Sequence, residues 1–321
     1  MREFTSLLAP LMRTYIAYQE ASGRWNESSY EVSLSLFDKY CAKQHPEARE
    51  VSQEMVDAWC GKRKTENNNS CRSRIYPIVS FVRYLRLRGK TTVMDPLIPR
   101  KEPREYIPHA FTEEELRNFF AACDSIPDKP SIEEQLSRRI TVPVFFRLLY
   151  SSGIRTTEAR QLKKGDVDLD HGVLNIQYSK GHDQHFVVLH ESMLELMRQY
   201  DVAIGKQYPD REYFFPARAK NGGCHTRAWV QNNFRKMWFQ YNGSYAVPYE
   251  IRHNYAVENI NSWTNEGFGF NKKLLYLSKS MGHSVIESTK YYYSLVPGLA
   301  EIIEAITDEG EIIPEVDYES F

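Results

Sequence analysis

The stretch from residue 95 to 108, DPLIPRKEPREYIP, constrains the fold of this chain more than any other segment. It holds four prolines, and each one pushes the residue before it out of helical geometry. We therefore expect an extended connector with compact structure on either side. Because 321 residues fit about two domains, the sequence predicts an N-terminal domain over 1–94, a linker over 95–109 and a second domain from 110 onward.

The N-terminal domain is predicted to be a small helical bundle. Apolar residues recur at helical spacing over 4–19 and 30–41, a third helix is suggested after Ser52, and Asn67 to Ser70 can cap a longer helix over 72–87. Basic residues surround these helices. They include Lys62, Arg63, Lys64, Arg72, Arg74, Arg83 and Arg86. A solvated basic face on a small bundle would show the same pattern.

The charge of the chain is unevenly placed. The formal net charge is -1, with 41 basic and 42 acidic residues. Eight of the acidic residues, and no lysine or arginine, lie in the tail from Glu301 to the end, so the preceding positions carry 41 basic against 34 acidic residues, a net charge of +7. The body of the protein is thus predicted to attract phosphates more strongly than its overall charge suggests.

Composition favours a soluble protein of the cytoplasm. No run of about 18 apolar residues is present, and the N-terminus does not begin a signal peptide. The five cysteines are scattered, without a CxxC pair. We expect reduced, mostly buried thiols, no structural zinc and no other metal, because no carboxylate cluster has the spacing of metal ligands.

The second domain contains an arginine placed just after a helix break. A capping box at Thr112 opens the domain, and an almost wholly apolar stretch over 141–150 predicts a central core helix. Gly153 can end that helix and present Arg155 at the break, while Glu158 lies one turn later and can orient the guanidinium. A surface ion pair is the alternative interpretation of these two residues.

Two further segments carry candidate functional groups. Alternation over 173–177 and 186–189 predicts a β-hairpin with Lys180 in its turn. Tyr249 and Arg252 lie one helical turn apart, so both side chains can meet one phosphate. The following residue, His253, is interpreted as structural.

The last motif is a corner near the C-terminal end. Gly282 can end the apolar run 274–281, and Ser284 with the glutamate three residues on predicts the cap of a new helix. His283 would then sit in a tight turn between two helices. The second of these helices would carry Tyr292. The segment 263–273, upstream of the corner, is predicted to form an extra loop.

These motifs, in this order, resemble those of the tyrosine recombinases, the integrase family that cuts and rejoins DNA strands. The resemblance covers essentially the whole chain and implies a mainly α fold with a small β-sheet, in which a helical core-binding (SAM-like) domain precedes a catalytic domain over 110–299. The catalytic residues that it implies are Arg155, Lys180, Tyr249, Arg252, His283 and Tyr292, with Glu158 and His253 behind them. The chain departs from the family pattern at Tyr249, where the usual residue is histidine. A tyrosine of pKa about 10 is a poor proton acceptor near neutrality.

The resemblance also implies a mechanism and partners. Tyr292 would attack a DNA phosphate to form a 3'-phosphotyrosine, without metal or cofactor, and Lys180 would protonate the leaving 5'-hydroxyl. The expected partners are double-stranded DNA with short inverted-repeat core sites and three further copies of the chain in a tetramer on DNA. The seven basic residues of the N-terminal domain named above would contact DNA phosphates. The resemblance is also compatible with an accessory directionality factor as a further partner. It suggests that the protein is the integrase of a mobile element. The tail over 300–321 would either dock into a neighbouring protomer or pack on its own domain.

Two other functions remain open from the sequence. The first is a DNA-binding protein on the same scaffold that has lost strand cleavage, for which Tyr249 is the warning sign. The second is a type IB topoisomerase-like enzyme, with the same chemistry and no site preference. The compact helical N-terminal domain favours the recombinase.

Overall fold

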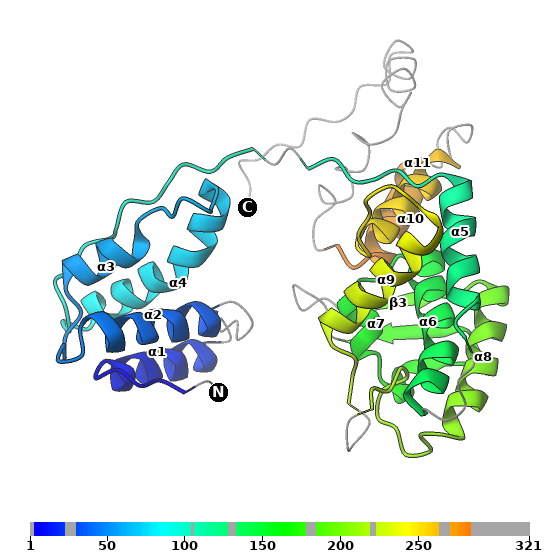
Figure 1. Cartoon of the computed structure of the whole chain (residues 1–321), viewed down its shortest axis with the longest axis horizontal. Coiled ribbons are helices and arrows are strands. Elements are labelled where there is room, and N and C mark those ends of the chain that lie inside the picture. The colour runs from blue at the N-terminus through cyan, green and yellow to red at the C-terminus, as the bar shows by residue number, and fades with distance from the viewer. Residues whose placement is uncertain are drawn as a thin grey trace, which may run out of the picture. The chain divides into compact units, whose positions relative to one another are not determined.

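A computed structural model describes residues 3–22, 30–103, 106–127, 133–177, 184–218, 223–262 and 270–283. The chain divides into two compact units, Met1–Tyr106 and Ile107–Phe321 (Figure 1). The division lies inside the predicted linker, because residues 95–103 make their hydrogen bonds to the first unit. Lys180 and Tyr292 lie outside the described residues, as does the tail over 300–321.

The first unit is a helical bundle. Its helices are α1 (Ala9–Ala21), α2 (Val32–Gln44), α3 (Gln53–Cys60) and α4 (Asn68–Leu87). Pro10 stands in the first turn of α1, where its missing N–H costs nothing, so this helix begins later than the apolar pattern predicted. The side chains of Ser52 and Asn67 cap α3 and α4. Tyr15, Phe37 and Phe81 are fully buried at the centre of the bundle.

The extended segment after α4 is fastened to that helix. Asn69 exchanges two hydrogen bonds with the backbone of Glu102, at 2.8 and 3.2 Å. Asn68 donates from its side chain to the carbonyl of Arg100 at 3.0 Å, and Arg72 donates to the carbonyl of Pro99 at 2.7 Å. The asparagines after Asn67, predicted only to help cap the helix, therefore also hold the start of the linker.

The second unit surrounds a long central helix, α6, whose second half is largely apolar. Within the described residues its elements are α5 (Glu113–Asp124), α6 (Glu133–Ser152), α7 (Thr156–Gln161), η2 (Lys164–Asp166), β1 (Val167–Asp168), β2 (Val173–Ile176), β3 (His185–Val188), α8 (Glu191–Gly205), α9 (Arg227–Tyr241), α10 (Glu250–Asn261) and α11 (Phe270–Ser280). The strands form one antiparallel sheet in the order β1-β2-β3. Phe145 and Phe146 of α6 are fully buried and pack against aromatic rings from α5, α9 and the segment before α9. This is the mainly α fold with a small sheet that the sequence predicted.

The predicted loop over 263–273 was too long at its C-terminal end. The structure begins α11 at Phe270, and residues 263–269 lie outside the described part. Leu274, Leu277 and Met281 are buried at a spacing of three and four residues, as one helical face requires. The asparagine, glycine and phenylalanine residues of this segment hid the start of that helix from sequence reasoning.

Four cysteines are buried and Cys224 is partly exposed. Burial raises the pKa of Cys41, Cys60 and Cys123 to about 12, so these thiols stay protonated and unreactive. Among the described residues, no helix is long and apolar enough to cross a membrane. In the same part of the chain, no group of three or more His, Cys, Asp or Glu side chains could hold a metal ion.

Candidate active site

Arg155 is held at the break between α6 and α7. Its backbone N–H donates to Glu158 Oε2 at 2.7 Å, and its Nη1 donates to Oε1 of the same carboxylate at 2.5 Å. The Glu158 side chain is only 1% exposed, so this ion pair is not the surface pair that was the alternative interpretation. Nη2 of Arg155 donates to the carbonyl of Gly282 at 2.9 Å. The first arginine and the C-terminal corner are therefore in direct contact, although 127 residues separate them.

Arg252 joins the same two turns from α10. It is 2% exposed, Nη1 donates to the carbonyl of Gly153 at 2.6 Å, and Nη2 donates to the carbonyl of Met281 at 2.6 Å. Nη2 also lies 3.0 Å from Nε2 of His283. A buried guanidinium is costly unless acceptors surround it. These backbone acceptors fix the charge of Arg252 in place.

Both turns require glycine. Gly153 and Gly282 have φ of 64° and 61°, in the left-handed region. A Cβ on Gly153 would lie 2.2 Å from the ring of Tyr255, and one on Gly282 would lie 2.5 Å from the ring of His185. The turns therefore combine an unusual backbone conformation with close packing on their surface.

The second turn is a Schellman motif that ends α11. The N–H of His283 donates to the carbonyl of Ser278 and that of Gly282 to the carbonyl of Lys279, each at 3.0 Å. The sequence predicted that Gly282 ends this helix, and the structure confirms it. The motif aims the imidazole of His283 toward the arginines.

His283 is neutral near physiological pH. Burial, the positive charges of Arg252 and Arg155, and His185 lower its pKa to about 4. Arginine can only donate, so Nε2 of His283 accepts from Arg252 and the ring proton lies on Nδ1. The side chain can thus donate one hydrogen bond from Nδ1 without carrying charge.

Tyr249 lies at the rim of this cluster. It is 45% exposed and precedes the first residue of α10, and its ring meets the edge of His253 at 5.1 Å between centroids. His253 is buried, and burial lowers its pKa to about 4. Its contact with the Tyr249 ring fits the packing role expected from the sequence.

Sequence reasoning missed three residues around the site. His185 begins β3 and is buried beside Gly282, Tyr255 packs on Gly153, and Glu250 is 3% exposed. Glu250 accepts hydrogen bonds from the backbone N–H groups of Val247 at 2.6 Å and His109 at 2.9 Å, which fixes the start of α10. Alternation along β3 could have placed His185 on the inner face, because Val187 two residues later is also buried.

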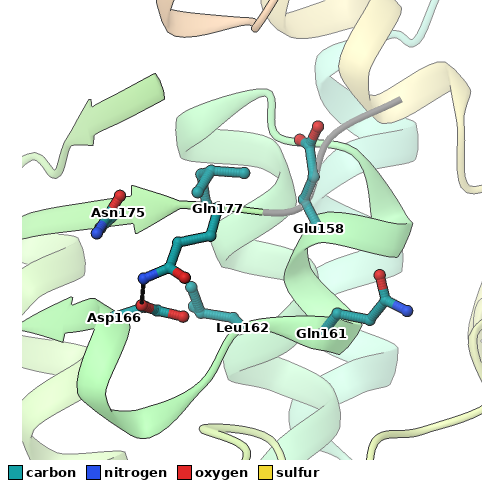
Figure 2. A pocket seen from close by; sticks show the side chains of 7 residues that line it. Glu158, Gln161, Leu162, Asp166, Asn175 and Gln177 are labelled. Carbon is teal, nitrogen blue, oxygen red and sulfur yellow. Dashed lines mark hydrogen bonds between the residues drawn. The ribbon is translucent and has the colours of Figure 1, made fainter. Parts of the chain in front are cut away.

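The end of β2 is held beside α7. Gln177 donates to Asp166 Oδ1 at 2.5 Å across a small hollow between α7, η2 and β2. Figure 2 shows these two side chains pointing toward one another, while the carboxylate of Glu158 points away from them. The hollow is no ligand pocket, since it holds only about 10 Å³. The hydrogen bond between Gln177 and Asp166 fixes the end of β2 against η2.

The seven basic residues predicted to contact DNA fall into two groups. Lys62, Arg63 and Lys64 are exposed on the segment after α3, where Lys62 donates to Asn68 Oδ1 at 2.6 Å and the Arg63 guanidinium lies over the Trp59 ring. The four arginines of α4 also have partners within the first unit, namely Glu66 and the carbonyl of Trp59 for Arg74, Asp95 for Arg83 and Arg86, and the carbonyl of Pro99 for Arg72. The Arg74 side chain is 11% exposed, and its pair with Glu66 lowers the pKa of that carboxylate to about 2.

The fold and the site together define a class of protein. Two arginines and a neutral histidine converge in a mainly α domain, and such a cluster of donors suits a phosphate group. The model of the phage integrase family matches residues 109–297, which is more than half of the chain. The chain belongs to this family, the tyrosine recombinases.

Its curated relatives carry recombinase names. A putative integrase/recombinase of Sinorhizobium fredii is 28% identical over 58% of this chain and 59% of its own length. The tyrosine recombinase XerA of Thermococcus kodakarensis is 26% identical over 71% of this chain and 72% of its own length. A probable integrase/recombinase of Methanocaldococcus jannaschii is 31% identical, but the chain spans only 42% of that protein.

Solved structures share the fold. The XerH site-specific recombinase, bound to palindromic difH substrate in a post-cleavage complex, superposes with a TM-score of 0.58 over 88% of this chain and 79% of the other, at 16% identity. A lambda integrase tetramer bound to a Holliday junction gives a TM-score of 0.58 over 97% of this chain and 80% of the other, at 14% identity.

Proposed function

We propose that this protein is a site-specific tyrosine recombinase that cuts and rejoins DNA strands through a 3'-phosphotyrosine on Tyr292. The observation that carries the proposal is the convergence of Arg155, Arg252 and His283 from three segments of the chain. Family membership supports the same reaction class, and the tyrosine nine residues after the corner histidine matches the family spacing.

The arrangement supports charge stabilisation at phosphorus. In the five-coordinate transition state the equatorial oxygens gain negative charge. Two guanidinium groups and the Nδ1–H of His283 would face that charge, already held in position by backbone acceptors and Glu158. Such preorganisation stabilises the transition state without rearrangement at the moment of reaction. Arginine suits this role because it stays charged and binds two oxygens at once.

The covalent step exchanges one phosphate ester for another. The Tyr292 hydroxyl gives up its proton to solvent as its oxygen forms a bond to phosphorus. The bond from phosphorus to the 5'-oxygen breaks, and Lys180 supplies the proton that the departing oxygen needs. In the reverse direction a 5'-hydroxyl attacks the phosphotyrosine and frees the tyrosine. The energy of the phosphodiester is thus conserved for rejoining.

The proposed partners follow from the first unit and from the relatives. The unit over 1–94 would bind one side of an inverted-repeat core site, with Lys62, Arg63 and Lys64 on phosphates. Four copies would assemble on DNA, as in the lambda integrase complex. The tail over 300–321 would dock into a neighbouring protomer, and deleting it should reduce cooperative assembly on DNA. An integrase of a mobile element, with an accessory directionality factor, would use this arrangement.

Capture of covalent DNA adducts tests the proposal. The wild type and a Tyr292→Phe variant would be expressed with their native genomic neighbourhood, and attached DNA would be sequenced. We expect adducts from the wild type only, concentrated at one or two short inverted repeats. Adducts scattered without site preference would favour a topoisomerase-like enzyme.

A second candidate function is DNA binding without cleavage. The observation that favours it is Tyr249, an exposed tyrosine at the position of the family's histidine. Binding to DNA without any adduct, followed by adduct formation in a Tyr249→His variant, would support this alternative.

A further inference from the structure

The carboxylate of Glu250 closes a tight turn at the start of α10. Its Oε2 accepts from the backbone N–H of Val247 at 2.6 Å, while the backbone N–H of Glu250 donates to the carbonyl of Val247 at 3.0 Å. Two hydrogen bonds between the same pair of residues therefore span Pro248 and Tyr249. The side chain of Tyr249 stands at the cap position and makes no capping hydrogen bond, so the start of the helix depends on Glu250 instead.

The other oxygen of this carboxylate binds a second segment of the chain. Oε1 accepts from the backbone N–H of His109 at 2.9 Å, from a residue 141 positions away in the sequence. Glu250 is only 3% exposed. A buried carboxylate is costly unless donors surround it, and it is favoured at a helix N-terminus, where the helix dipole is positive. Both conditions hold here, so Glu250 fixes the start of α10 to the segment that precedes α5.

His109 is itself held in place. Its Nε2 lies 3.0 and 3.1 Å from the two carboxylate oxygens of Glu115, which belongs to the capping box of α5. The imidazole also meets the edge of the Trp238 ring, at 5.9 Å between centroids. The Trp238 indole donates to the carbonyl of Ser244 at 2.7 Å, in the connection from α9 to α10. Through His109, the carboxylate of Glu250 is therefore fixed to two helices of the core.

Arg252 lies in the first turn of α10, so its main chain follows the turn that Glu250 closes. The backbone N–H of Arg252 donates to the carbonyl of Tyr249 at 3.2 Å. At the other end of the residue, the guanidinium donates to the carbonyls of Gly153 and Met281. A shift of the helix start would move the main chain of Arg252 while these two carbonyls stay in place. The guanidinium would then lose a bond or leave the position that faces the phosphate.

We propose that Glu250 is a positioning residue that sets where Arg252 stands, by holding the first turn of α10 against His109. It acts through Arg252, because a side chain this buried is not available to DNA. The inference deepens the proposed function and rests on it. Glu250→Gln tests it with little change of shape, since one oxygen becomes an NH2 group that cannot accept from an N–H. One buried N–H then loses its partner and the turn loosens.

The experiment is a double-mutant cycle on DNA cleavage. Single-turnover adduct formation is measured at saturating protein on a duplex that carries the inverted repeat at which the wild type forms adducts. We expect Glu250→Gln to lose on the order of 100-fold in rate, the effect of misplacing a group by about 1 Å. Combined with Arg252→Lys, the same change should cost no more than about threefold further, because both substitutions disable one group. DNA affinity should change little, since phosphate contacts elsewhere dominate binding.

Asp201→Asn is the matched control. It removes a carboxylate of α8 that is paired with Arg211, outside the cluster of donors described above. This variant should therefore have a lower melting temperature and normal cleavage. If Glu250→Gln shows no cooperative melting, Glu250→Asp provides the same comparison, because it keeps the charge and is one methylene too short to reach both N–H groups.

Two results would overturn the proposal. Losses that multiply in the double variant would mean that Glu250 acts independently of Arg252. A rate for Glu250→Gln equal to that of Asp201→Asn would mean that Arg252 does not need this carboxylate. Failure of the proposed function itself looks different, because the wild type would then form no adduct at any repeat, or Tyr292→Phe would form one.

Discussion

Arg252 donates from Nη2 to Nε2 of His283 at 3.0 Å, and this hydrogen bond fixes the tautomer of the histidine. The same Nη2 donates to the carbonyl of Met281, one peptide before the glycine that turns the chain. The arginine thus orients both the side chain and the backbone of the corner. The guanidinium that we propose binds the phosphate also holds the local fold, so the free protein already carries the assembled donors.

Replacing the planar guanidinium of Arg252 with an ammonium group should slow the reaction although the positive charge is kept. Arg252→Lys keeps a cation but cannot bond Gly153, Met281 and His283 together. We expect cleavage of a core-site substrate to fall by about 10²- to 10³-fold, the range for losing one preorganised donor. Arg147→Lys, on a partly exposed ion pair with Asp124, should change the rate little. Single-turnover adduct formation measures both, and near-normal cleavage by Arg252→Lys would contradict this role.

The Gly153 turn offers a test of close packing. Gly153→Ala adds backbone strain at φ of 64° and a clash with Tyr255, whereas Gly89→Ala has the same φ with open space around it. Strain alone costs about 1–2 kcal/mol. The free energy of unfolding, measured in urea, should fall by about 1–3 kcal/mol more for Gly153→Ala than for Gly89→Ala. Equal losses would show that Tyr255 moves aside freely.

Buried histidines predict the dependence of stability on pH. Burial lowers the pKa of both His225 and His253 to about 4, while an unfolded histidine has a pKa of about 6.5. Between these values the unfolded chain binds more protons, so the free energy of unfolding should fall as the pH drops from about 6.5 to 4. Above 6.5 these groups contribute no pH dependence.

Denaturation in urea at pH 7 and pH 5 measures this loss. The variant His253→Leu should lose less stability between the two pH values than wild type, by roughly 1 kcal/mol or more. Leu277→Ala, a buried substitution without a titrating group, serves as the control and should lose as much stability between the two pH values as wild type. If His253→Leu lost as much stability between pH 7 and pH 5 as wild type does, the lowered pKa of His253 in the folded protein would be contradicted.

The two groups of basic residues in the first unit should respond differently to mutation. Lys64→Ala removes an exposed charge, so DNA affinity should fall. The slope of log affinity against log salt should become shallower by about one, the value for a single phosphate contact. Arg74→Ala removes the partner of Glu66 and of the Trp59 carbonyl, so it should lower the melting temperature instead. Fluorescence anisotropy at several salt concentrations and thermal melts distinguish these effects. A salt slope unchanged by Lys64→Ala would exclude that residue from the interface.

Local signals predicted the elements that carry the site. Gly153 and Gly282 marked the turns, and the capping box at Thr112 and the cap at Asn67 marked helix starts, because each depends on neighbouring residues alone. The contact between Arg155 and the Gly282 carbonyl spans 127 residues. No local pattern encodes a pairing across that distance, so the resemblance alone grouped these residues.

Other features could not be predicted from the sequence because they depend on partners that lie far away along the chain. His185 reads as an ordinary strand residue until the corner is packed against it. The arginines of α4 form the same basic pattern in the sequence whether they contact DNA or the linker. The sequence pattern alone therefore does not show which of the two they bind. Asn68 and Asn69 read as a helix cap because the carbonyls that they bind lie more than 30 residues away.

Mapping the covalent bond tests the central claim most directly. The protein would be trapped on a nicked core-site substrate and digested, and the peptide bearing the nucleotide would be sequenced by mass spectrometry. We predict a 3'-phosphate ester on Tyr292 of the Tyr-Tyr-Tyr sequence, absent in Tyr292→Phe. A nucleotide on Tyr291 or Tyr293, or a nicked product with no attached peptide, would contradict the mechanism.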